Sequence, residues 1–108
     1  MAEHEARRHV EIADDGRLMA TAEIEPTDEA GVVRATLHVE SGHLPPGTRS
    51  RLVDAVLDTA EVKPGDRLEA TVPMGDAEIL ERVRERCDDV ATRPAGATVL
   101  VEASPRQS

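Results

Sequence analysis

The sequence predicts one α/β (α+β) domain, a mixed β-sheet with two helices packed on it in the order β-β-β-α-β-α-(β)-β. Three observations carry this prediction. Apolar residues alternate through 32–40, which is the period of a half-buried strand. Through 48–60 they lie on one stripe at helical spacing. A further alternating stretch at 68–72 then makes a strand-helix-strand unit, which favours a parallel pair with a right-handed crossover.

Length and charge limit the classes of protein to consider. The 108 residues suit a single domain, with an ordered core expected at about 8–103 and loose ends. The net charge of −9 argues against nucleic-acid and membrane partners, because both favour basic surfaces. The one cysteine, Cys87, excludes an internal disulfide, and no apolar run reaches membrane-spanning length. We therefore expect a cytoplasmic protein, with Cys87 as a buried structural thiol on the second helix.

The absence of Phe, Tyr and Trp bears on assembly. Aromatic residues usually bury the most area per residue, so this core has to be built from aliphatic side chains. Packing against a second copy or a protein partner would compensate, and an apolar sheet face could supply the contact. We therefore expect a homodimer or a protein partner, and a stable aliphatic monomer is the alternative.

The first three strands form a predicted antiparallel meander. Residues 10–12 and 18–24 indicate a hairpin around Asp15-Gly16, since Asp-Gly suits a turn that needs positive φ. Pro26 ends the second strand, and the third runs over 32–40. Short links between consecutive strands favour their pairing as neighbours.

The first helix is expected to follow a Gly/Pro turn at 41–48. It would run from Pro46 or Thr48 to Ala60, with Thr48 as its possible N-cap. The turn brings backbone N–H groups at a helix start close to the end of a strand. If the chain has a ligand site, this turn is the place to expect it.

The second helix is predicted to open at Asp76, a good N-cap residue. Glu78 is placed to pair with Arg82 at i,i+4, and the arginines at 82, 84 and 86 read as a solvated helix surface. A short strand at 90–93 and a final strand at 97–103 follow. The apolar run at 99–101 suits a strand that is covered on both faces.

This order of elements resembles the C-terminal two thirds of the GNAT N-acetyltransferase superfamily fold. Residues 67–83 are similar to the family's strand followed by a helix that opens with Asn or Asp, and 32–60 match the layout of its cofactor-binding strand, loop and helix. The resemblance implies that the first helix holds the pyrophosphate of acetyl-CoA at its N-terminus. It also implies that the pantetheine arm lies where the two parallel strands diverge. The family's loop signature is matched only at Gly47, and the chain has no Tyr to act as general acid.

Two groups of candidate site residues follow. The turn at 45–51 could bind an anion or coenzyme A, because a glycine permits close approach and two arginines add charge; its candidates are Gly47, Thr48, Arg49 and Arg51. The alternative is a rigid cap with solvated arginines. On the third strand, His38 or Glu40 could act as a general base if its polar face lines a cleft, and otherwise they belong to an exposed strand face.

No metal site is expected, since the spacing of His9, His38 and His43 matches no ligand motif. The predicted function is that of a non-catalytic GNAT-like binding or interaction domain that needs no cofactor. The first alternative is a minimal N-acetyltransferase or acyl-CoA binder that uses acetyl-CoA at the 45–51 turn, and the second is a structural homodimer. The arrangement of the parallel strands discriminates between these readings, because a ligand cleft requires them to separate beside Gly47.

Overall fold

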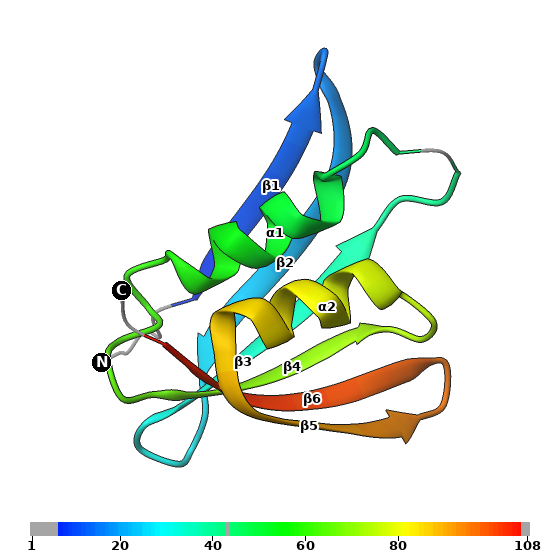
Figure 1. Ribbon diagram of the computed structural model, residues 1–108. Coiled ribbons are helices and arrows are strands. Elements are labelled where there is room, and N and C mark those ends of the chain that lie inside the picture. Colours follow the sequence, from blue (N-terminus) through cyan, green and yellow to red (C-terminus); the bar gives the residue numbers. More distant parts are fainter. Residues whose placement is uncertain (1–6, 43, 107–108) are drawn as a thin grey trace.

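The computed structural model describes residues 7–42 and 44–106 as a six-stranded sheet with two helices (Figure 1). The strands are β1 (Arg8–Asp14), β2 (Arg17–Pro26), β3 (Val32–Val39), β4 (Arg67–Pro73), β5 (Cys87–Ala95) and β6 (Thr98–Pro105), and the helices are α1 (Thr48–Leu57) and α2 (Ala77–Arg86). The mixed α+β fold predicted from the sequence is therefore confirmed.

The strands lie in the order β1-β2-β3-β4-β6-β5. The neighbours β3 and β4 are parallel and are joined through α1, whereas the other neighbouring pairs are antiparallel. The meander, the parallel pair and the intervening helix are thus placed as their sequence spacing predicts. The β1–β2 turn also behaves as expected, with positive φ at Asp15 (53°) and Gly16 (74°).

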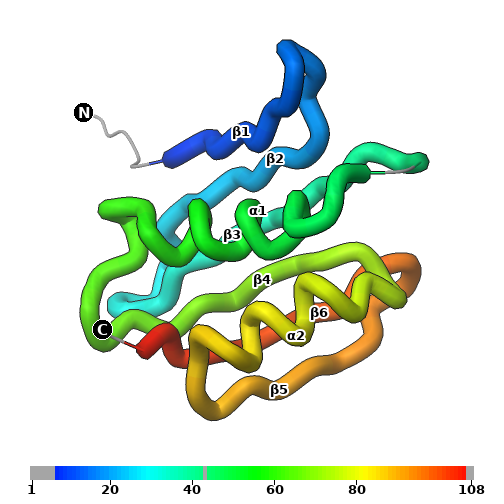
Figure 2. The backbone as a smooth tube through the Cα atoms, turned by 45° about the horizontal axis from the view of Figure 1, so that its top comes forward, coloured from blue at the N-terminus to red at the C-terminus, as the bar shows by residue number. Residues whose placement is uncertain are grey.

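Both helices pack on one face of the sheet, and the opposite face stays open (Figures 1 and 2). The aliphatic core lies between these two layers. Leu52 of α1 and Ile79 of α2 have no exposed surface, and they sit over the buried strand residues Ala35, Ala70 and Val101. Burial of this kind, at about 25 cal/mol per Å² of apolar surface, holds the helices on the sheet.

The start of α1 differs from the prediction. Gly47 is the N-cap, with a φ of 86°, and Thr48 is the first helical residue. The buried hydroxyl of Thr48 donates to the carbonyl oxygen of Pro45 at 2.8 Å, so Thr48 is not the cap. The helix ends at Leu57 rather than at residue 60, because both the N–H and the hydroxyl of Thr59 turn back to the carbonyl of Val56.

The C-terminal hairpin also differs. The short strand expected at 90–93 is part of the longer β5, which starts directly after α2 and pairs with β6. The coverage of 99–101 on both faces is wrong, because both helices lie on the same side of the sheet. Val101 is buried under them, whereas Leu100 is only half-buried on the open face.

The two outermost strands carry irregularities. In β1 the register with β2 shifts between Ile12 and Ala13. In β5 the register with β6 shifts between Asp88 and Ala91, and the intervening Asp89 has a φ of 53°.

The surface gives little support to an apolar dimer face. Among the described residues, the large hydrophobic side chains that are exposed are Leu18 (38%) and Met74 (50%). The open face of the sheet carries charged pairs such as Arg34–Glu69. The homodimer therefore stays a prediction, and the described surface does not show the apolar face that we expected to form its interface. Over the described ranges, neither helix is long and apolar enough to span a membrane, and the cytoplasmic location also stays a prediction.

Candidate functional site

The parallel strands separate at their C-terminal ends. β3 and β4 are paired as far as Thr36 and Thr71. Beyond that point β3 stays with β2 up to Val39, whereas β4 stays with β6 up to Pro73. The split opens towards the N-termini of both helices, which follow these strand ends.

A cleft of about 480 Å³ occupies this split. Its lining comes from the end of β3 and the following turn, from the first turn of α1, and from the β4–α2 connection with the start of α2; the residues are Val39, Glu40, Ser41, Arg49, Pro73, Met74, Gly75, Asp76, Ala77 and Glu78. This volume is in the range of small-ligand sites. The strand separation that a ligand cleft requires is therefore present.

An ion pair joins the two helix starts across the cleft. The guanidinium of Arg49 donates through Nε to Oδ2 of Asp76 at 2.7 Å. The other carboxylate oxygen of Asp76 accepts the N–H of Ile79 at 3.2 Å, which confirms Asp76 as the N-cap of α2. The Asp76 side chain is only 8% exposed, so its charge depends on these two donors.

A second carboxylate sits on the N-terminus of α1. Oε2 of Glu78 accepts the backbone N–H of Ser50 at 3.2 Å and its hydroxyl at 3.1 Å. The first N–H groups of a helix have no partner within the helix, and they carry partial positive charge. Glu78 therefore takes up the N–H of Ser50, which would otherwise be free to bind an external anion. Its predicted partner was Arg82, and that prediction is wrong.

The charge of the cleft is predominantly negative. Three carboxylates line it, those of Glu40, Asp76 and Glu78, against the single guanidinium of Arg49. The Arg49–Asp76 pair neutralises one of these charges, and two negative charges remain. A phosphate group entering here would meet like charges at close range, where the interaction is strongest.

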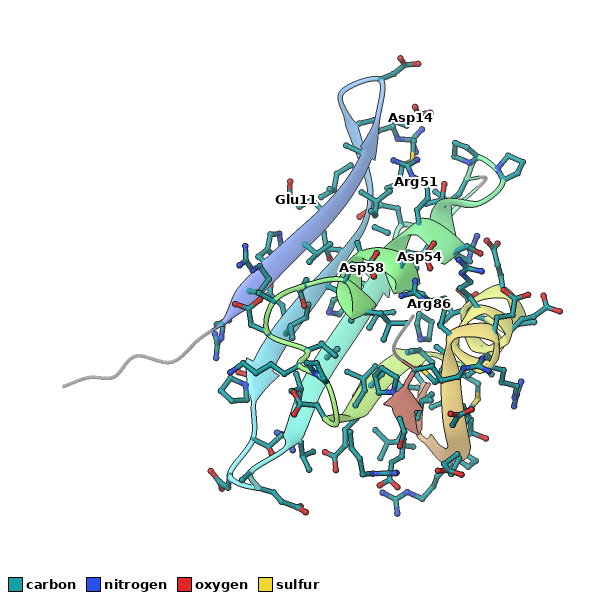
Figure 3. The ribbon with its side chains drawn as sticks, turned by 60° about the vertical axis from the view of Figure 1, so that its left-hand side comes forward. Glu11, Asp14, Arg51, Asp54, Asp58 and Arg86 are labelled. Atoms are coloured by element: carbon teal, nitrogen blue, oxygen red, sulfur yellow. The ribbon has the colours of Figure 1, made fainter. Side chains whose placement is uncertain are left out.

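The candidate anion residues are distributed unevenly. Arg49 lines the cleft, whereas Gly47 and Thr48 lie outside its lining. Arg51 lies on the side of α1 towards the β1–β2 hairpin (Figure 3). Whether these residues bind an anion stays a prediction.

The two candidate bases are also separated. Glu40 is exposed and lines the cleft. His38 is exposed on β3 opposite Thr21, on the open face of the sheet and outside the cleft lining. His43 lies outside the described residues. Within those residues, no group of three or more His, Cys, Asp and Glu side chains is arranged to hold a metal ion.

Of the three arginines on α2, Arg84 is exposed as the sequence suggested, whereas Arg82 and Arg86 pair with carboxylates of α1. Arg82 donates to both carboxylate oxygens of Asp54 on α1, at 2.9 and 3.1 Å. Arg86 bridges Asp54 and Asp58 at 2.8 and 3.0 Å, and Figure 3 shows Arg86 directed at both carboxylates. The hydrogen bond from Arg82, opposed by partial burial and assisted by Arg86, lowers the pKa of Asp54. This network fixes the distance between the helices behind the cleft.

Cys87 is buried, with 4% exposure, as predicted, but its place on the second helix is wrong: α2 ends at Arg86, and Cys87 is the first residue of β5 with an extended backbone. Burial raises the pKa of its thiol, and Cys87 lies outside the cleft lining. It is therefore a poor source of a thiolate or of a proton for chemistry in the cleft.

Sequence reasoning missed two residues of this site, Asp76 and Glu78. Asp76 was recognised only as a helix cap, and Glu78 was assigned to a local pair. The available signal was their position at the start of the helix that follows the second strand of the parallel pair. The C-terminal ends of two parallel strands lie at the same edge of a sheet, so the helices that follow the two strands begin near each other.

Comparisons with known proteins bear on the fold. No protein-family model and no curated protein matches the sequence. Among solved structures, the chain is similar to a ribosomal-protein-alanine N-acetyltransferase from Brucella melitensis, at 13% identity and a TM-score of 0.62, covering 91% of this chain and 68% of that one. It is also similar to an N-acetyltransferase from Staphylococcus aureus, at 11% identity and a TM-score of 0.60, covering 90% of this chain and 66% of the other.

A third similar structure is a putative acetyltransferase from Salmonella typhimurium, solved with its cofactor acetyl-CoA. It is 13% identical with a TM-score of 0.53, and the match covers 83% of this chain and 58% of that one. The chain thus spans between 58% and 68% of the length of these three proteins. At such identities the likeness concerns architecture, and the architecture of this chain is a GNAT-like fold.

Proposed function

We propose that this protein is a non-catalytic GNAT-like binding domain whose cleft takes a ligand without phosphate. One observation carries the proposal: the carboxylate of Glu78 already accepts the hydrogen bond of the Ser50 N–H, at the start of α1 beside the point where β3 and β4 separate. For an anion to use that donor, Glu78 would have to move into a region that already holds Asp76 and Glu40. The pyrophosphate of acetyl-CoA would therefore bind against both a lost contact and like-charge repulsion.

The described residues that line the cleft do not supply the proton donor that acetyl transfer requires. The leaving thiolate needs a proton donor near the reacting atoms. The sequence contains no Tyr, Cys87 is buried elsewhere, and His38 lies on the open face. Among the described residues, the titratable groups that line the cleft are three carboxylates and an arginine. This composition suits recognition better than proton donation.

The ligand class follows from the charges left over. With two negative charges unneutralised, the cleft favours a group with positive charge. Met74 is half-exposed on the wall and offers apolar contact to a short aliphatic stem. A primary ammonium on such a stem, in a small molecule or in a partner's side chain, matches both features.

Calorimetry with acetyl-CoA tests the exclusion of phosphate. The unmodified protein should show no binding at low micromolar affinity. Glu78→Gln should bind about tenfold more tightly than the unmodified protein, since it removes one negative charge and leaves only a weaker, neutral acceptor on the N–H of Ser50. Glu81→Gln is the matched control, because Glu81 is exposed on the same helix outside the cleft lining, and it should change nothing. Low micromolar binding by the unmodified protein would refute the proposal.

A matched pair of small probes tests the ligand class. In NMR titrations, butylammonium should shift the amide resonances of Ser50 and Glu78, whereas butyrate should leave them unchanged. The Glu78→Gln variant should weaken the response to butylammonium. Equal responses to both probes would contradict a charge-selective cleft.

One observation favours a second candidate, an acyl-CoA binder or minimal N-acetyltransferase. The strands separate beside α1, and a similar structure carries acetyl-CoA. A thiol-release assay with acetyl-CoA and a panel of amines addresses it directly. Turnover that Glu40→Gln abolishes would favour this candidate over the first.

A further inference from the structure

A histidine on the outermost strand lies between two carboxylates. His9 of β1 stands directly opposite Glu23 of β2 and two residues before Glu11. Its Nδ1 contacts the carboxylate of Glu23, and its Nε2 lies 3.0 Å from Oε2 of Glu11. All three side chains are about half exposed, on the open face of the sheet. Figure 3 shows Glu11 on the side of β1 away from α1.

These contacts favour one protonation state of the ring. A neutral imidazole carries one N–H, and an ionised carboxylate can only accept hydrogen bonds. Contacts from both ring nitrogens to two ionised carboxylates therefore require the imidazolium. Protonated His9 satisfies both contacts, whereas the neutral ring can keep only one of them as a hydrogen bond.

Among the described residues, the other charges next to the ring on this face are Arg7 and Glu25, which lie beside the His9–Glu23 pair towards the start of β1 and neutralise each other at 2.8 Å. On β2 the next residue on this face is Thr21, opposite Glu11, and on β3 the residue opposite Glu23 is Thr36. Both are neutral, and the helices lie on the other side of the sheet. When His9 loses its proton, Glu11 and Glu23 keep two negative charges with no positive group between them.

The basic residues that precede His9 are engaged elsewhere. Arg7 pairs with Glu25 at 2.8 Å, and Arg8 pairs with Glu61 in the α1–β4 connection at 3.1 Å. β1 has β2 as its sole strand neighbour in the sheet order, and its core face, with Ile12 buried, packs against α1. On the open face, the contacts along the β1–β2 ladder hold the strand.

We propose that His9, Glu11 and Glu23 form a pH-sensitive clasp, which holds β1 on β2 while His9 is protonated and loosens the strand when the proton leaves. Hydrogen bonding by Glu23 and then by Glu11 raises the pKa of His9 above its ordinary 6.5. A group whose pKa is raised by folding stabilises the fold below its unfolded pKa and loses that contribution as the pH rises through the folded value. The clasp therefore opens on the alkaline side of about pH 6.5.

Amide hydrogen exchange measures the opening of the strand. After correction for the intrinsic pH dependence of exchange, the open fraction of β1 should rise about two- to fivefold between about pH 5.5 and about pH 8.5. The amides of β4 should show no such rise. In His9→Gln the pH dependence of β1 should disappear, whereas His38→Gln, which replaces another exposed histidine of the same face, should keep it.

A histidine titration by NMR tests the same cluster without relying on strand opening. The pKa of His9 should lie above 6.5 in the unmodified protein and should fall in both Glu23→Gln and Glu11→Gln. The proposal is overturned if β1 exchange has the same pH dependence in the unmodified protein and in His9→Gln. It is equally overturned if neither glutamate substitution moves the titration of His9.

Discussion

Asp76 combines two roles that substitution can separate. One carboxylate oxygen caps α2 by accepting the N–H of Ile79, and the other binds Arg49 across the cleft. Alanine removes both interactions. Asparagine keeps a capping oxygen, because Asn and Asp are comparable N-caps, but it removes the charge that Arg49 binds.

The expected losses follow from the two contacts. Loss of the cap costs about 0.5–2 kcal/mol, and a hydrogen bond to a charged group contributes about 1.5–3 kcal/mol. The Arg49 side chain is 29% exposed and can rehydrate when its partner is gone, so the lower end of the second range applies. We expect Asp76→Ala to lower the free energy of unfolding by about 2–3.5 kcal/mol and Asp76→Asn by about 1.5 kcal/mol.

Urea unfolding at neutral pH measures both changes, provided that the m-value stays constant. Glu81→Ala, an exposed change in the same helix, should stay within about 0.5 kcal/mol of the unmodified protein. A double-mutant cycle of Asp76→Asn and Arg49→Gln isolates the ion pair. Arg49→Gln should destabilise the unmodified protein but should cost nothing further in the Asp76→Asn background. Equal losses in Asp76→Ala and Asp76→Asn would refute the separation of cap and charge.

Three further predictions concern stability and assembly. Asp54→Asn should lower the free energy of unfolding by about 0.5–1 kcal/mol at neutral pH. Because arginine contacts lower the pKa of Asp54, denaturation curves should show this loss above the carboxyl's ordinary pKa of 3.8, and the loss should fade as the pH falls below that value. Leu52→Ala, at a fully buried position, should cost about 2–5 kcal/mol in the same assay, and a loss below 1 kcal/mol would contradict its place in the core. Sedimentation should reveal a homodimer at micromolar concentration, and a single monomeric species would remove that prediction.

Much of the fold could be predicted because local patterns determine it. The alternation in β3 and β4 and the helical stripe that ends in Leu57 are set by which residues face the core, and the core lies on one side of the sheet. The parallel relation of the two strands then follows from the helix between them. The length of β5 could not be predicted, since its exposed residues at an outer edge carry no period, and its pairing with β6 alone defines it.

The candidate site was harder to predict from the sequence, because local patterns do not determine its contacts. Sequence spacing identifies neighbours one turn apart, so Glu78 was matched with Arg82. In the fold both residues turn to α1 instead, Glu78 to Ser50 and Arg82 to Asp54, which lie 28 residues away in the chain. Partners of this kind appear only once the packing of two helices is known. Arg49 and Glu40 were found because they flank the turn itself.

The irregular outer strands have a consequence for solubility. A sheet with regular edges offers free N–H and C=O groups on which further chains can stack. Here one edge is interrupted between Ile12 and Ala13 in β1, and the other at Asp89 in β5, which also carries Pro94 without an N–H to donate. Neither border offers an uninterrupted template for strand addition. Concentrated samples of this chain should therefore resist growth into fibrils, despite a sheet that spans the whole domain.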